Sequence, residues 1–176
     1  MLDLNQLSRK LIDYTNVKGN YGKDAAVCAI INDDLNILLE KRVMNENDPW
    51  SGQVSFPGGH FEKYDVYIMN TALRELNEET GINKIIVLGG LDIQHPRNML
   101  SLNVYPFLCY LEKFENLKPQ KSEVEYFFTP SIKDLKEGYT MINMDGIESR
   151  EKCFFYKNEI IWGMTARIIE KIRILF

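Results

Sequence analysis

The sequence predicts a mixed α/β domain in which helices pack on a sheet. Short apolar runs bounded by Gly, Pro, Asn or Asp recur along the chain, and segments with helical spacing of apolar residues interrupt them. The length of 176 residues suits one domain spanning residues 1–176, with enough chain to bury a core. Strands that alternate with helices place those helices on the faces of the sheet.

Each expected element follows from a local pattern. Apolar residues at helical spacing predict amphipathic helices over residues 1–15, over 71–80 and from 163 onward. Gly81 is expected to end the second helix. A loop should follow the first helix and extend to residue 24. Apolar runs predict strands at residues 25–31, 36–42, 53–56, 85–93, 102–111 and 124–128, and on both sides of Lys157-Asn158. The polar turn at residues 32–34 indicates that the first two strands form a hairpin.

The net charge argues against one class of function. The formal net charge of -4 argues against a protein that coats nucleic acid, which would need a basic face. A nucleotide substrate stays open, because a metal ion can carry the positive charge. Mg²⁺ or Mn²⁺ is therefore compatible with this acidic chain.

The cysteines and the N-terminus favour a cytoplasmic location. The three cysteines, Cys28, Cys109 and Cys153, lie far apart in the sequence, and the first two stand inside apolar runs. None is therefore expected to form a disulfide or bind a metal. The N-terminal residues have no continuous apolar stretch and carry Asp3 early, so a signal peptide is not expected. No apolar run approaches the roughly 18 residues of a membrane span, and no membrane partner is expected.

The segment RELNEETGI (74–82) concentrates acidic side chains on one helix. Glu75, Glu78 and Glu79 occupy an arc of roughly 100°, next to the apolar arc that must face the core. A solvated helix face is the simpler interpretation of this segment alone. The upstream residues favour a cation site instead, because a hard divalent cation binds converging carboxylates and Gly58-Gly59 lets a phosphate approach the backbone.

This order of strand, Gly-Gly, loop, acidic helix and Gly resembles the Nudix hydrolases, whose box reads G-x5-E-x7-R-E-U-x-E-E-x-G-U, with U aliphatic. The second half of the box matches at Arg74, Glu75, Leu76, Glu78, Glu79, Gly81 and Ile82. The resemblance implies an α/β/α sandwich with a mixed sheet and helices on both sides. It also implies a box over about residues 59–82 within a single Nudix hydrolase domain.

The first half of the box departs from the family pattern. The loop after Gly59 is one residue longer, and Asp65 stands where the family has glutamate. In the family that glutamate supports the loop through the box arginine. The resemblance therefore implies a structural ion pair between Asp65 and Arg74.

Further segments resemble the coenzyme A pyrophosphatase branch of this family. These are LLLEKR followed by GQVSFPGG, the longer box loop, SEVEYFFTPSIKDL, and EIIWGMTARIIEKI near the end of the chain. The branch has an arginine at the place of Asn47, and its loss weakens the substrate assignment. ADP-ribose or a nucleotide sugar stays an alternative substrate, and a non-catalytic nucleotide-binding module stays an alternative function. The oligomeric state does not follow from the sequence, and a homodimer stays open.

The resemblance implies hydrolysis of a nucleoside diphosphate linked to another group. Glu75 and Glu79 are the expected metal ligands, with Glu78 next, and Arg74 is expected to orient the carboxylates. Substrate contacts are expected from Arg42, Gly58, Gly59, His95 and Arg97. The general base is expected from a neighbouring loop or from the acidic helix itself, with Glu78, Glu79 and Glu123 as catalytic candidates.

SEVEYFF (122–128) offers two glutamates for the role of base. Strand alternation places Glu123 and Glu125 on one face, and a solvated sheet edge explains both equally well. Glu123 aligns with the glutamate of the Asp-Glu-Val strand of the branch, whose aspartate is replaced by Ser122. Glu123 is therefore the preferred base of the two.

Overall fold

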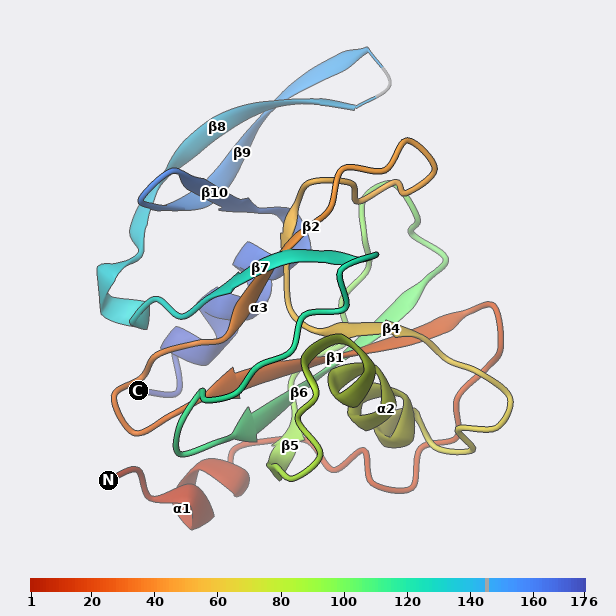
Figure 1. The fold of residues 1–176 in the computed structure, drawn as a ribbon, viewed down its shortest axis with the longest axis vertical. Coiled ribbons are helices and arrows are strands. Elements are labelled where there is room, and N and C mark those ends of the chain that lie inside the picture. Colours follow the sequence, from red (N-terminus) through yellow and green to blue (C-terminus); the bar gives the residue numbers. More distant parts are fainter. Residues whose placement is uncertain (145) are drawn as a thin grey trace.

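The computed structural model describes residues 1–144 and 146–176. Over this range the helices are α1 (Leu4–Ser8), α2 (Ile68–Thr80), α3 (Gly163–Arg173) and the short 3-10 helix η1 (Ile132–Asp134). The strands are β1 (Asp24–Ile31), β2 (Leu39–Arg42), β3 (Val54–Ser55), β4 (Gly58–His60), β5 (Ile86–Gly90), β6 (Asn103–Tyr110), β7 (Val124–Phe128), β8 (Lys136–Met144), β9 (Ile147–Tyr156) and β10 (Glu159–Trp162). They form sheets with the strand orders β4-β1-β6-β5, β3-β2-β7 and β10-β9-β8 (Figure 1).

Strand β1 lies inside the four-stranded sheet, and both of its faces are covered. It pairs antiparallel with β4 and parallel with β6, so the sheet is mixed. Ala26, Cys28 and Ile30 belong to a buried cluster with residues of α2. Val27 and Ala29, on the opposite face, belong to a second cluster that includes residues of α3. The expected α/β class, with helices on both sides of a mixed sheet, is confirmed.

Helix α2 carries the acidic segment and follows the expected periodicity. Ile68, Ala72 and Leu76 recur every four residues and are buried against the sheet. The helix begins three residues before the expected residue 71. It ends at Gly81 as expected, with φ +77 and a hydrogen bond of 2.8 Å from the Gly81 N–H to the Asn77 carbonyl. The left-handed conformation at this position favours glycine.

Two expectations for the N-terminal part are wrong. The helix expected over residues 1–15 ends at Ser8, because Ile12 exchanges backbone hydrogen bonds of 2.9 and 2.7 Å with Gly90. Segments 25–31 and 36–42 do not form a regular hairpin. They pair only next to the turn, through an antiparallel bridge between Ile31 and Ile37 and a hydrogen bond of 3.0 Å from the Leu38 N–H to the Ile30 carbonyl, after which β2 joins β3 and β7 in a different sheet.

The long hairpin of β8 and β9 was not expected from the sequence. Its register runs from Lys136 paired with Phe155 to Met144 paired with Ile147, and Figure 1 shows it extending beyond the rest of the fold. The hairpin expected around Lys157-Asn158 is confirmed by the pairing of β9 with β10. Over the described residues, no helix combines the length and apolar character that crossing a bilayer requires.

Candidate active site

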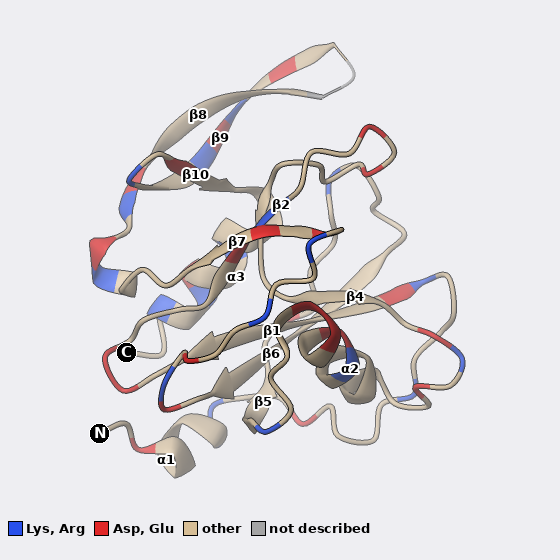
Figure 2. Cartoon of the chain, viewed as in Figure 1, with Lys and Arg blue, Asp and Glu red and all other residues tan. Residues whose placement is uncertain are grey.

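Arg74 ties the loop before α2 to the acidic face of that helix. Its Nε and Nη2 atoms donate to the two carboxylate oxygens of Asp65 at 3.0 and 3.1 Å, so the expected ion pair is present and bidentate. Nη1 donates to Glu75 at 2.7 Å and to Glu78 at 3.1 Å. Nη2 also donates to the His60 carbonyl at 3.0 Å. One guanidinium thus positions two carboxylates and the strand that carries His60; Figure 2 shows the acidic and basic segments together on α2.

Asp65 is anchored from several directions. It also accepts hydrogen bonds of 2.9 Å from the Glu62 N–H and from the Thr71 hydroxyl. Burial raises the pKa of Asp65, but the hydrogen bonds from Arg74, Glu62 and Thr71 outweigh it and leave the pKa lowered. The next residue, Val66, has φ +62, which β-branched residues rarely adopt. The anchored carboxylate therefore holds the longer loop in a strained path.

The three box glutamates differ in burial. The side chain of Glu78 is 50% exposed and that of Glu75 15% exposed. Glu79 is 1% exposed, so it points further inward than the rim position that its arc suggested. Its Oε2 accepts the Gly58 N–H at 2.7 Å, while its Oε1 has no hydrogen-bond partner. Burial and the nearby charge of Glu40 raise the pKa of Glu79 to about 9.

Gly58 and Gly59 bring the backbone of β4 next to these carboxylates. A Cβ atom on Gly59 would lie 2.4 Å from the Glu75 Oε1. A Cβ atom on Gly58 would lie 2.2 Å from the Ala26 carbonyl oxygen. A side chain at position 58 would meet backbone, and one at position 59 would displace the Glu75 carboxylate, so glycine at both positions permits this close approach.

Glu40 is a buried carboxylate whose charge acts on Glu79, and the sequence did not single it out. It lies on β2, is fully buried, and accepts a hydrogen bond of 2.8 Å from the Ser55 hydroxyl. Burial raises the pKa of Glu40 to about 7, although the hydrogen bond from Ser55 and the charge of Arg42 lower it; the charges of Glu123 and Glu75 add smaller upward contributions. The available signal was a charged residue inside the apolar run NILLEKR (36–42).

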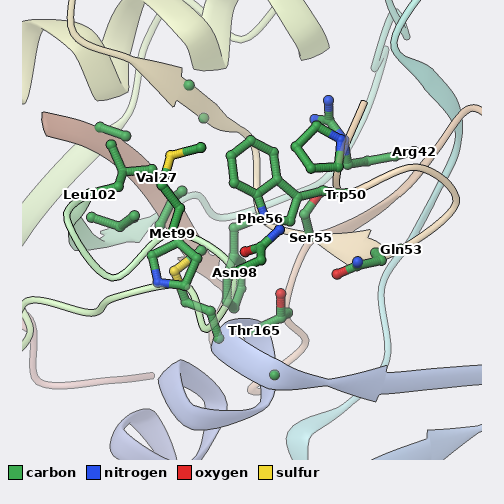
Figure 3. A pocket seen from close by; sticks show the side chains of 18 of the residues that line it. Val27, Arg42, Trp50, Gln53, Ser55, Phe56, Asn98, Met99, Leu102 and Thr165 are labelled. Carbon is green, nitrogen blue, oxygen red and sulfur yellow. The ribbon is translucent and has the colours of Figure 1, made fainter. Parts of the chain in front are cut away.

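A cavity of about 820 Å³ lies beside the acidic helix. Its walls come from β1, β4, the loop before β3, the loop before β6, the β8 strand and the start of α3. In Figure 3, Trp50, Met99 and Thr165 approach it from three separate parts of the chain. The expected site residues that line it are Arg42, Gly58, Gly59, Glu75, Glu78, Arg97 and Glu123.

Comparison with known proteins places this geometry in a family. The model of the NUDIX domain matches residues 22–148, which is most of the chain. The chain belongs to the NUDIX family. The uncharacterized Nudix hydrolase NudL of Pectobacterium atrosepticum is 30% identical over 129 residues, covering 69% of this chain and 66% of that protein. NudL of Photorhabdus laumondii is 33% identical over 129 residues, covering 69% and 67%.

Solved structures show the same fold at low sequence identity. A MutT NUDIX hydrolase from Burkholderia pseudomallei has a TM-score of 0.53 at 19% identity, covering 85% of this chain and 97% of that one. A MutT/nudix family protein from Enterococcus faecalis has a TM-score of 0.55 at 15% identity, covering 90% and 63%. These likenesses support the NUDIX fold and say nothing of the substrate.

The expected substrate-binding side chains differ in position. Arg42 lines the cavity and is held by Asp48, with Nη2 to Oδ2 2.7 Å. Arg97 also lines it and forms an ion pair with Glu151. His95 lies outside the cavity wall, and its Nδ1 is 3.1 Å from the Leu102 carbonyl oxygen.

Glu123 and Glu125 are separated by a bulge. Arg42 of β2 is opposite Val124 and Lys41 is opposite Tyr126, so Glu125 has no residue opposite it and strict alternation fails here. Glu123, just before β7, lines the cavity and accepts a hydrogen bond of 3.0 Å from Gln120. Glu125 is exposed and outside the cavity wall.

The donor set of the NUDIX box fits a hard divalent cation. All the candidate ligands offer carboxylate oxygens, and one of them, the Glu79 Oε1, is buried without a hydrogen-bond donor. Arg74 already occupies oxygens of Glu75 and Glu78. Accordingly, no three His, Cys, Asp or Glu side chains in residues 1–144 and 146–176 converge in a ready ligand arrangement.

Proposed function

We propose that this NUDIX protein hydrolyses the pyrophosphate of a nucleoside diphosphate linked to another group, with Mg²⁺ or Mn²⁺ as cofactor. The supporting observation is that Glu75, Glu78 and the Gly58-Gly59 backbone line one cavity large enough for a nucleotide. Glu79 lies behind this wall with a free, buried oxygen. These carboxylates outnumber the one guanidinium, that of Arg74, that bonds to them, and such an excess of negative charge suits a cation that in turn binds phosphate.

The proposed roles follow from these positions. Glu75 and Glu79 hold the cation, with Glu78 as a further ligand or base. Arg74 orients Glu75 and Glu78 through its hydrogen bonds of 2.7 and 3.1 Å and does not contact the substrate. When bound, the cation neutralises negative charge on the phosphate oxygens. Glu123 accepts the proton of the water that attacks phosphorus, and the bond from that phosphorus to the bridging oxygen breaks.

Coenzyme A or a derivative is the proposed substrate, with 3′,5′-ADP and 4′-phosphopantetheine as products. The support is the longer box loop together with the WGMT segment (162–165). All four residues of this segment line the same cavity as the box glutamates. The branch-like segment therefore lies where it can contact a substrate that is bound at the carboxylates.

Product analysis on a small panel of substrates tests the proposal. Purified protein is incubated with Mg²⁺ and coenzyme A, ADP-ribose or a nucleotide sugar, and kcat/KM is compared. We expect the highest value for coenzyme A. A clear advantage for ADP-ribose would refute the branch assignment and leave the hydrolase assignment standing. Binding of nucleotides without turnover of any of them would refute the enzymatic function and favour a nucleotide-binding module.

A further inference from the structure

Two buried carboxylate oxygens lack any hydrogen-bond partner, and they belong to neighbouring residues. In the described part of the chain, the buried side-chain nitrogen and oxygen atoms without a partner are the Glu40 Oε2 and the Glu79 Oε1. The two residues come from different elements, β2 and α2. Unpaired buried polar atoms are rare in folded proteins, so two in one place call for a shared explanation.

Each of these carboxylates is anchored through one oxygen and leaves the other free. The Ser55 hydroxyl holds the Glu40 Oε1 at 2.8 Å, and the Gly58 N–H holds the Glu79 Oε2 at 2.7 Å. The charge of Glu40 acts on Glu79, the charges of Glu75 and Glu123 act on Glu40, and the positive charge of Arg42 offsets part of this repulsion at both carboxylates. Ser55 and Gly58 are three residues apart, so both carboxylates are anchored to one short segment of the chain, Glu40 from β2 and Glu79 from α2.

Burying both oxygens without a hydrogen-bond or metal partner is unfavourable. An unpaired polar group in the interior has lost its hydrogen bonds to water without replacement, and the loss is greater for a charged group. The two carboxylates would also repel each other if both were ionised. A divalent cation between them would satisfy both free oxygens and cancel the repulsion.

We propose that Glu40 is a further metal-binding residue of this NUDIX protein, supplying an oxygen from β2 to the cation that Glu79 binds. The proposal rests on the metal-dependent function proposed above. It adds a ligand that lies outside the acidic helix and outside the box. The competing explanation is a structural pair in which one carboxyl is protonated and no cation is bound.

Mn²⁺ binding in the absence of nucleotide tests the proposal without relying on turnover. The full chain is stripped of metal with EDTA, dialysed and titrated with Mn²⁺, and free Mn²⁺ is measured by electron paramagnetic resonance. The variants are Glu40→Gln, Glu79→Gln and the control Glu125→Gln, which removes one exposed glutamate charge. We expect Glu40→Gln to weaken Mn²⁺ binding by about 10–100-fold. We expect Glu79→Gln to weaken it at least as much and Glu125→Gln to leave it unchanged.

The outcomes separate this proposal from the proposed function. Wild-type affinity in Glu40→Gln together with weak binding in Glu79→Gln would overturn the role of Glu40 and keep the metal site. Wild-type affinity in both would overturn the metal site itself. Thermal unfolding with and without Mn²⁺ checks that each variant folds. If Glu40→Gln does not fold, Glu40→Leu is titrated instead, and wild-type affinity there counts equally against the proposal.

Discussion

Asp65→Asn would remove the negative charge that Arg74 contacts in two places, with almost no change in side-chain shape. The native carboxylate receives the Arg74 Nε at 3.0 Å and Nη2 at 3.1 Å. An amide offers one acceptor oxygen, so one guanidinium N–H would face another donor. Arg74 would keep only Glu75 and Glu78 as carboxylate partners, and both belong to its own helix.

The magnitude follows from burial. Breaking a fully buried ion pair costs about 3–5 kcal/mol. The Asp65 side chain is 3% exposed and the Arg74 side chain 18% exposed, so water partly solvates the arginine that is left behind. We therefore expect a loss of about 2–3 kcal/mol in the free energy of unfolding. For a domain of this size, that loss lowers the Tm by roughly 4–12 °C.

The pH dependence has a definite sign. The pKa of Asp65 is lowered from 3.8, so its contribution to stability is fully present above pH 3.8 and is lost as pH falls through the folded-state pKa. The difference in stability between the wild type and Asp65→Asn should therefore be constant at neutral pH. It should shrink only below a pH of about 4.

Urea unfolding monitored by circular dichroism at pH 7, with EDTA present, measures the effect. The exposed Asp34→Asn is the matched control for loss of one aspartate charge, and Arg74→Met completes a double-mutant cycle. We expect a coupling energy of about 1–3 kcal/mol between Asp65 and Arg74. A change within about 0.5 kcal/mol of wild type in Asp65→Asn, as for an ordinary surface substitution, would refute this reasoning.

The remaining predictions concern the cavity. Glu123→Gln should lower kcat by about 10²–10⁴-fold with little change in KM, whereas Glu125→Gln should leave kcat and KM nearly unchanged. Equal small effects of both variants in steady-state kinetics would place the general base on the acidic helix instead. Gly59→Ala should fold, as circular dichroism can verify, but lower kcat by about 10²-fold. Its Cβ would lie 2.4 Å from the Glu75 Oε1, so wild-type activity would show that this carboxylate can move without loss of function. Trp50→Ala should raise the KM for the nucleotide about fivefold through loss of aromatic contact, and an unchanged KM would show that the nucleobase of the substrate does not contact Trp50.

The acidic helix could be predicted because its signals are local. The spacing of Ile68, Ala72 and Leu76 fixes the buried face, and Gly81 fixes the end. Once that face is known, the side on which Glu75 and Glu79 lie follows from geometry. The ion pair of Asp65 with Arg74 came from the family pattern and not from local spacing.

Long-range pairing limited the rest of the prediction. The Leu pattern of the first residues favoured a long helix, but the backbone pairing of Ile12 with Gly90 depends on a strand almost 80 residues away. The role of Glu40 depends on β2 leaving the sheet of β1, which a local hairpin pattern could not reveal. The β8 and β9 hairpin was missed although Asp-Gly at 145–146 is a strong turn signal, because its strands carry charged residues on the exposed face.

The measurement that tests the central claim most directly is the Mg²⁺ dependence of coenzyme A hydrolysis in Glu79→Gln. This change replaces a fully buried carboxyl, whose pKa burial raises to about 9, with a neutral amide of similar volume, so stability without metal should stay the same or rise. We predict that wild-type protein is active only with a divalent cation and that Glu79→Gln loses activity by about 10²–10³-fold even at saturating Mg²⁺. A Glu79→Gln variant that keeps most of the wild-type kcat/KM would contradict the metal site on which the proposed function depends.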